Sequence, residues 1–174
     1  MAIIDRIIQY SQEHVSYARQ ELLKTRQALS KNEHSIQDLR GMLQRMKLMR
    51  ESDLNLNFGS ALCDYMDSMI VLHNSQNALA THLSIAMSFL AESLDLIAES
   101  RLADVSYFSY FQSIRMIVAD IRRILSDYDT KQIPKDGIAS AIARMEAIAR
   151  TMDSSRSAEI SEMLRGIRQT IAYY

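Results

Sequence analysis

The stretch HNSQN (residues 73–77) decides the fold, because it is either a turn between two helices or a polar patch inside one long helix. It lies in a run without charged side chains, residues 68–91. An interhelical turn would normally contain Gly or Pro and would shift the phase of the apolar pattern, but a heptad template passes through HNSQN unshifted. The template selects Leu62, Met66, Met69, His73, Gln76, Ala80, Leu83, Met87, Leu90, Leu94 and Ile97. We therefore predict one continuous helix over about 60–101.

The segment before this helix carries the same heptad pattern. From Ile4 to Met46 the template selects mostly apolar side chains, no Pro interrupts them, and only Gly41 weakens the pattern. A first long helix is predicted over about 3–50. The stretch ESDLNLNFGS (51–60) is rich in turn-forming residues, so it predicts the break between the two long helices.

Three shorter helices are predicted after the second long one. The first runs from about residue 104 or 106 to 128, the next follows Pro134, and the last follows DSSRS (153–157). The 174-residue chain has only 4 Gly and 1 Pro, which argues against sheets with tight hairpins. The predicted fold class is an all-α, elongated antiparallel bundle. Its long two-helix coiled-coil hairpin (about 3–50 and 60–101) is packed by shorter C-terminal helices.

A hairpin centred near residue 55 predicts which residues of the two long helices face each other. In this register Asn32 lies opposite residue 77, close to Gln76, and Ile36 lies opposite His73. The polar positions of both helices then coincide. We expect Asn32, His73 and Gln76 to form a structural polar layer, which costs stability but fixes the register.

The lengths of the helices also predict how the chain is divided. The third helix is long enough to cover the second only back to about residue 80. With the last two helices returning along it, residues 1–174 form a single all-helical domain with a four-helix body. The rest of the hairpin, about residues 36–72, would project from this body as an arm.

The predicted arm carries more apolar side chains than a lone hairpin can bury. Met46, Met66 and Met69 are expected to pack in the hairpin seam. The residues predicted to bind a partner are Met42, Leu48, Met49, Leu56 and Phe58, with Arg45 and Arg50 flanking them. Met side chains adapt to varied surfaces, and an exposed apolar patch favours a partner protein or a second copy of the chain.

Two acidic pairs support an alternative, enzymatic interpretation. Asp64 and Asp67 form one i, i+3 pair, and Glu92 and Asp95 form another. This spacing is similar to that of the all-α nucleoside triphosphate pyrophosphatases, and the resemblance implies magnesium held by these four carboxylates during nucleotide hydrolysis. In an unbroken helix the pairs lie roughly 37 Å apart, too far to share a metal within one chain.

No other pattern predicts a metal or cofactor site. The His residues never fall at i, i+4, and the chain has no Gly-rich phosphate loop. The single cysteine, Cys63, excludes an intrachain disulfide and favours a reducing, cytoplasmic location. The uncharged run 68–91 is long enough to cross a bilayer, but its central polar side chains make a membrane span unfavourable.

These features together predict a non-enzymatic protein that binds other proteins. We expect an adaptor, chaperone-like or assembly component that acts through helical packing, associates with copies of itself and needs no cofactor. A nucleic-acid-associated assembly subunit is a second alternative. It is disfavoured because the net positive charge of residues 1–50 has an acidic neighbour in residues 51–105.

Overall fold

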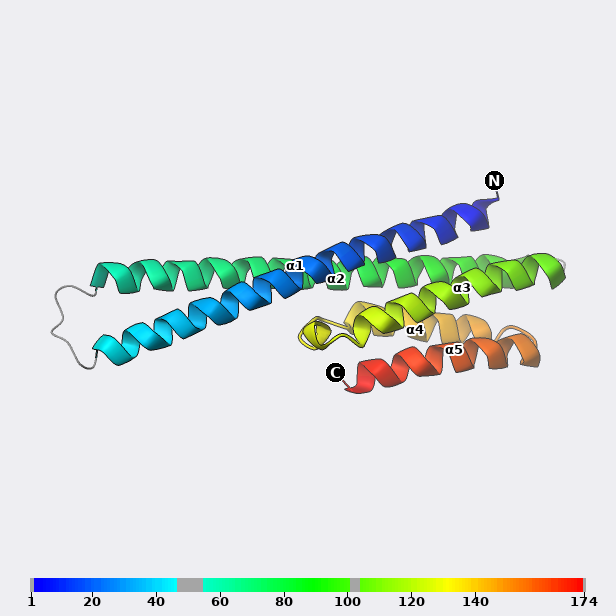
Figure 1. The fold of residues 1–174 in the computed structure, drawn as a ribbon. Helices are drawn as coiled ribbons and strands as arrows, with labels where there is room; N and C mark the ends of the chain where they lie inside the picture. The colour runs from blue at the N-terminus through cyan, green and yellow to red at the C-terminus, as the bar shows by residue number, and fades with distance from the viewer. Residues whose placement is uncertain (1, 47–54, 101–103, 174) are drawn as a thin grey trace.

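The computed structural model describes residues 2–46, 55–100 and 104–173. Within these residues the chain forms five α-helices, one short 3-10 helix and no strand, which confirms the predicted all-α fold class. The elements are α1 (Ile3–Met46), α2 (Asn55–Glu99), α3 (Asp104–Leu125), η1 (Tyr128–Thr130), α4 (Asp136–Ala149) and α5 (Ser154–Tyr173). The helices α1 and α2 form a long antiparallel hairpin, and the shorter helices lie against one half of it (Figure 1).

HNSQN lies within α2, so the prediction of one continuous helix is confirmed. Three of its polar side chains form hydrogen bonds along the same helix. Asn77 and His73 share a hydrogen bond of 3.0 Å, and the Ser75 hydroxyl donates to the Leu72 carbonyl at 3.1 Å. Because these bonds join residues three or four positions apart, they are compatible with an unbroken helix.

The boundary between the long helices differs from the expected one. The helix α2 begins at Asn55, so Leu56 and Phe58 lie in its first turns and not in a loop. The described part of α1 ends at Met46, and residues 47–50 of the predicted first helix lie outside the described residues. Of the predicted break at 51–60, residues 51–54 lie outside the described residues, and Asn55, Asn57 and Gly59 lie inside the helix.

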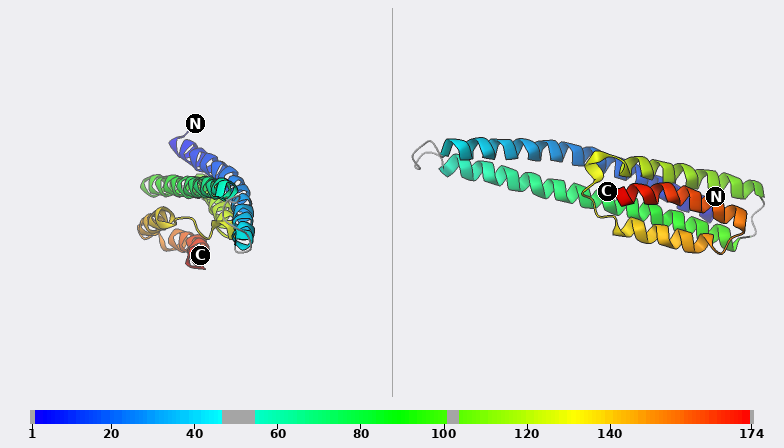
Figure 2. Two further views of the ribbon diagram at one scale, coloured as in Figure 1. Left: turned by 90° about the vertical axis from the view of Figure 1, so that its left-hand side faces the viewer. Right: turned by 90° about the horizontal axis from the view of Figure 1, so that it is seen from below.

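The five helices of the described chain close into a ring, in the order α1, α2, α4, α5, α3 and back to α1. The end-on view in Figure 2 shows α4 and α5 on the far side of the ring from α1. The helix α4 runs parallel to α2, because Gly137 near its start approaches Ser84 and Arg144 one turn from its end reaches Glu92. We call this five-helix part the body.

The predicted four-helix body is therefore wrong by one helix. The last two helices were expected to return along α3 together. Instead α5 turns back after residues 150–153 and runs antiparallel to α4, where Arg168 donates to Glu146 at 2.7 Å. Each of the two helices buries its own apolar side in this arrangement, α4 with Ile142 and Met145 and α5 with Leu164 and Ile167.

The core lies within the body. The largest fully buried side chains come from α2 after residue 78, from α3 and from α4: Leu79, Leu83, Met87, Leu90, Leu94, Ile97, Ile114, Ile121, Leu125, Ile138, Ile142 and Met145. Each such side chain stabilises the fold by about 1.5–3 kcal/mol. No described residue of the hairpin outside the body is on this list, so the body supplies most of the stability.

The register of the hairpin differs from the expected one. The Asn32 amide donates to Ser68 at 2.9 Å, and the hydroxyl oxygens of Thr25 and Ser75 lie 3.2 Å apart. Asn32 of α1 therefore lies opposite Ser68 of α2, about two helical turns before the expected partner Gln76. His73 is exposed. The predicted layer of Asn32, His73 and Gln76 is wrong in its α2 members, because small serines face α1 in the arm and the template positions face elsewhere.

The hairpin projects beyond the body as an arm, which we define as residues 27–46 of α1 and 55–74 of α2. The body ends where Arg26 binds Asp127 and Asp129 beside η1, the latter at 2.8 Å. The arm is therefore longer on α1 than the predicted 36–72. In Figure 1 the arm extends to the left, with no other helix beneath it. Among the described helices, none has the length and apolarity needed to cross a membrane.

Candidate functional site

The predicted partner-binding residues fall into three groups in the structure. Leu48, Met49 and Arg50 lie outside the described residues, as does the side chain of Leu56. Met42 and Phe58 are partly buried, and Met42 lines a small groove between the two helices of the arm. Arg45 is exposed and donates to the Gly41 carbonyl of its own helix at 3.3 Å.

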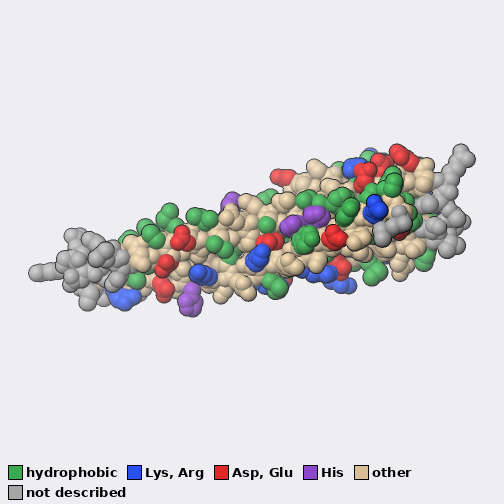
Figure 3. Space-filling view, turned by 90° about the horizontal axis from the view of Figure 1, so that it is seen from above, with side chains coloured by type: hydrophobic (Ala, Val, Ile, Leu, Met, Phe, Trp, Pro, Cys, Tyr) green, Lys and Arg blue, Asp and Glu red, His purple; other side chains and the backbone are tan. Residues whose placement is uncertain are grey.

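A row of exposed apolar side chains lies on α2 of the arm instead. Leu62, Met66 and Met69 are 39%, 55% and 47% exposed, and they are followed by the exposed His73. We call these four residues the stripe. Met66 and Met69 were expected in the hairpin seam, but the buried Ser68 and Ser75 are the residues that bond to α1. Figure 3 shows the side of the hairpin that faces away from α4, and hydrophobic side chains are exposed along the arm on this side as well.

The stripe continues a face of α2 that is covered in the body. Eighteen residues make five full turns of an α-helix, so residues 18 apart lie on one line. Leu62 is in line with Ala80, Met66 with Ser84, and Met69 with Met87. Ala80 and Met87 are 6% and 0% exposed, and Ser84 lies against Gly137 of α4, where an added Cβ would come within 2.5 Å of its hydroxyl. The face that α4 covers in the body is thus uncovered in the arm.

The helix α1 shows a similar change between the body and the arm, in the ion pairs that its charged side chains form. Arg19, Arg26, Glu33 and Arg40 follow one another at seven-residue steps and lie along one side of α1. Arg19 binds Asp120 of α3 at 3.1 Å, and Arg26 binds the two carboxylates beside η1. Glu33 and Arg40 lie beyond the body and form no ion pair within the described residues. We call these four residues the charged line.

The two acidic pairs do not come together in this structure. Asp64 and Asp67 lie in the arm, and Glu92 and Asp95 lie in the body on the same unbroken helix, roughly 37 Å away. Arg144 of α4 binds Glu92 at 2.8 Å and approaches Asp95 at 3.8 Å. Among the described residues, no three His, Cys, Asp or Glu side chains gather closely enough to bind a metal ion. The arrangement of four carboxylates that the resemblance implies is therefore not formed within one chain.

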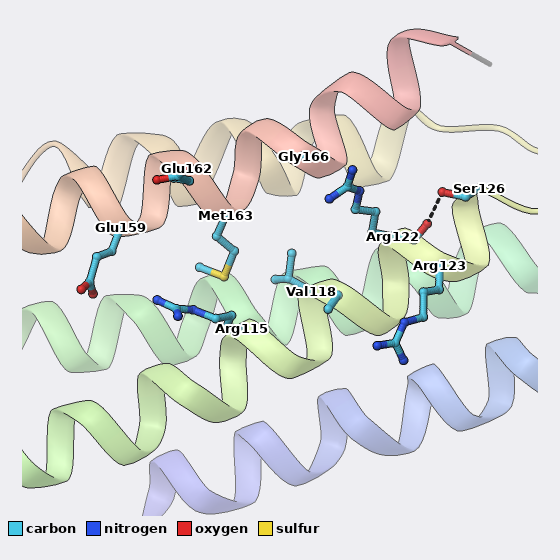
Figure 4. A pocket seen from close by; sticks show the side chains of 10 residues that line it. Arg115, Val118, Arg122, Arg123, Ser126, Glu159, Glu162, Met163 and Gly166 are labelled. Atoms are coloured by element: carbon cyan, nitrogen blue, oxygen red, sulfur yellow. Dashed lines mark hydrogen bonds between the residues drawn. The ribbon is translucent and has the colours of Figure 1, made fainter.

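A groove of about 680 Å³ lies between α3 and α5, and the sequence pattern did not indicate it. Figure 4 shows Val118 and Met163 in its middle, with Arg115 and Arg122 from α3 and Glu159 and Glu162 from α5 around them. Gly166 makes room for the Arg122 guanidinium, since a Cβ at this position would lie 2.8 Å from one of its nitrogens. Charges of both signs line the groove, so it does not offer the uniform positive field that a nucleic acid needs.

A histidine pair joins α1 and α2 on the outer side of the hairpin. The Nδ1 atoms of His14 and His82 are 3.0 Å apart. Tyr17 packs against both rings, Phe89 packs against His14, and Tyr10 packs against Phe89. Burial lowers the pKa of His82 below its ordinary value of 6.5, and the nearby His14 lowers it further. Burial and the neighbouring His14 therefore favour the neutral form of His82.

Comparisons with protein-family models, with curated protein sequences and with solved structures give no match for this chain.

Proposed function

We propose that this chain is an interaction and assembly protein, whose body holds a rigid helical arm for packing against another helical surface. The observation that carries this proposal is the stripe, which repeats in the arm the face that α4 covers in the body. A surface with the geometry of a helix–helix interface but no helix on it is suited to receive one.

The chemistry of the stripe supports this use. Along α2 from Asn55 to Ala91 the only charged residues are Asp64 and Asp67, and helical periodicity places both away from the stripe. Half-exposed Leu and Met side chains each contribute about 1 kcal/mol when a partner buries them. Met66 and Met69 also adapt their shape to a partner more readily than branched side chains do.

The single cysteine is compatible with a reducing compartment. Cys63 is exposed and unpaired as a thiol, and such thiols persist where glutathione keeps them reduced. We propose the cytoplasm as the place where this function is carried out. No observation in the described structure favours nucleotide hydrolysis over protein binding.

The proposal is tested by photo-crosslinking from the stripe in living cells. A photoreactive amino acid at Met66 should give covalent adducts with whatever protein covers the stripe, and mass spectrometry identifies that protein. The matched control is the same amino acid at Val71, which is 56% exposed in the same part of α2 but is not part of the stripe. The proposal fails if adducts from Met66 are no more abundant or specific than adducts from Val71.

A further inference from the structure

We infer that the surface covering the stripe is the arm of a second copy of this chain, laid antiparallel across the first arm. This inference rests on the proposed function and names its partner. The uncovered sides of the two arms would face each other across a two-fold axis near the middle of the arm. The result is a four-helix segment with one body at each end.

The length of the arm supports a second copy. The hairpin extends about 20 residues beyond the body, or roughly 30 Å, and leaves an open space of the same length beneath it (Figures 1 and 2). An arm of this length fills the space left by the other copy, and the reverse holds by symmetry. A shorter helix would leave part of the stripe uncovered, and a longer one would meet the end of the body.

The area is sufficient for a dimer of moderate affinity. Two helices side by side are about 20 Å wide, so each arm offers about 600 Å² over its length. Two arms together would bury about 1,200 Å², which is at the lower limit for specific protein–protein interfaces. We therefore expect an association that depends on concentration and is sensitive to single substitutions.

The charged line gives the arm a self-complementary pattern. Glu33 and Arg40 are placed symmetrically about the middle of residues 27–46, one on each side of residues 36 and 37. When two copies of α1 lie antiparallel about this point, Glu33 of each copy faces Arg40 of the other. Two ion pairs then form between the copies. They lie on the same side of α1 on which Arg19 and Arg26 are paired within the body.

The same symmetry lays the stripe of each copy against α2 of the other copy. The hydrogen bond between Asn32 and Ser68 sets the register of the hairpin, so the middle of the α1 arm is level with residues 63 and 64 of α2. The two copies of α2 therefore also cross near the middle of the arm, so that Leu62 lies near the two-fold axis and Met69 of one copy lies opposite Phe58 of the other. Apolar side chains then meet apolar side chains on α2, and opposite charges meet on α1. A helix of unrelated sequence would have to supply both patterns at once.

Light scattering on the purified full chain tests the inference. We expect the mass of a dimer at tens of micromolar, falling toward that of a monomer on dilution. The triple variant Leu62→Ser/Met66→Ser/Met69→Ser should remain monomeric, with helix content by circular dichroism unchanged. The matched control Leu23→Ser/Val71→Ser removes two side chains that are 57% and 56% exposed outside the stripe, and it should dimerise like the natural chain.

A charge exchange tests the two-fold geometry without touching the apolar surface. Glu33→Arg places like charges in contact at both symmetric positions and should weaken the dimer roughly two- to thirtyfold. Adding Arg40→Glu to the same chain restores opposite charges and should restore most of the affinity. A double variant as weak as the single one would overturn the antiparallel arrangement.

Different results would contradict the dimer of two arms and the proposed function. A natural chain that is monomeric up to hundreds of micromolar would overturn the inference of a second copy. If Met66 nevertheless crosslinks specifically to a different protein in cells, the proposed function stands with another partner. If Met66 gives no specific adduct with any protein, the proposed function fails as well.

Discussion

Met69 and Met87 lie five full turns apart on one face of α2, yet Met87 is fully buried beneath the shorter helices and Met69 is 47% exposed. The same change from covered to uncovered separates Leu62 from Ala80. On α1 it separates the paired Arg19 and Arg26 from Glu33 and Arg40. Both long helices therefore repeat, beyond the body, a side that the chain itself covers or pairs within the body.

Stability should depend on pH through His82. Burial, and then the neighbouring His14, lowers its pKa below 6.5; Glu21 opposes this shift and Lys24 adds to it. Below about pH 6.5 the unfolded chain takes up this proton more readily than the folded one, so the free energy of unfolding should fall as the pH falls from that point. Urea unfolding between about pH 7.5 and 5.5 measures the change.

His82→Gln should reduce this pH dependence. His34→Gln, which replaces an exposed histidine of the arm, should leave it unchanged. Equal slopes in the natural chain and in His82→Gln would show that the histidine pair is not responsible.

Gly137 allows α4 to lie close to α2. A Cβ at this position would lie 2.5 Å from the Ser84 hydroxyl and 3.0 Å from the Ser84 Cβ, and the latter cannot move without the backbone. Gly137→Ala should therefore destabilise the chain by about 1–3 kcal/mol, although Ala is the better helix former. Chemical denaturation gives the free energy of unfolding.

Gly41 provides the matched control in an open part of α1, where the nearest atom to an added Cβ is 3.9 Å away. Gly41→Ala should stabilise the chain by about 0.5–1 kcal/mol. Destabilisation by both substitutions would mean that close packing at Gly137 does not explain its effect.

The hydrogen bond between Asn32 and Ser68 should couple the two helices of the arm. A double-mutant cycle with Asn32→Ala and Ser68→Ala should give a coupling energy of about 0.5–1.5 kcal/mol, because the pair is buried. The exposed pair of His73 and Asn77 serves as the comparison and should couple by less than about 0.5 kcal/mol. A coupling at Asn32 no larger than that at His73 would argue against this pair as the determinant of register.

The sequence predicted the fold class and the continuity of α2 because both depend on long-range periodicity. The scarcity of Gly and Pro and the unshifted heptad phase through HNSQN are properties of the chain alone. The number of helices in the body was not predictable in the same way. It depends on the direction that the chain takes after residues 150–153, and four residues of turn sequence do not determine that direction.

The site that we propose lies in the arm predicted from the sequence, but Met66 and Met69 were not among the residues predicted to bind a partner. The heptad template ranks positions by apolarity, so it assigned Met66 and Met69 to the seam. The real seam uses Ser68 and Ser75, whose hydroxyls bond across or along the helices. Small polar side chains allow two helices to approach closely, and the larger apolar side chains then lie on another side of the helix. A template that ranks positions by apolarity does not detect this arrangement.

Crosslinking through Cys63 tests the antiparallel dimer most directly. The two-fold axis passes near residues 63 and 64, and packed helices lie about 8–10 Å apart, so a short thiol crosslinker should join Cys63 of one copy to Cys63 of the other. In a control chain that combines Cys63→Ser with Gln12→Cys, the thiols would be roughly 70 Å apart in the same dimer. We predict covalent dimers from the natural chain and none from the control. Efficient crosslinking of the control, or no Cys63 crosslink at concentrations where light scattering shows a dimer, would contradict the arrangement.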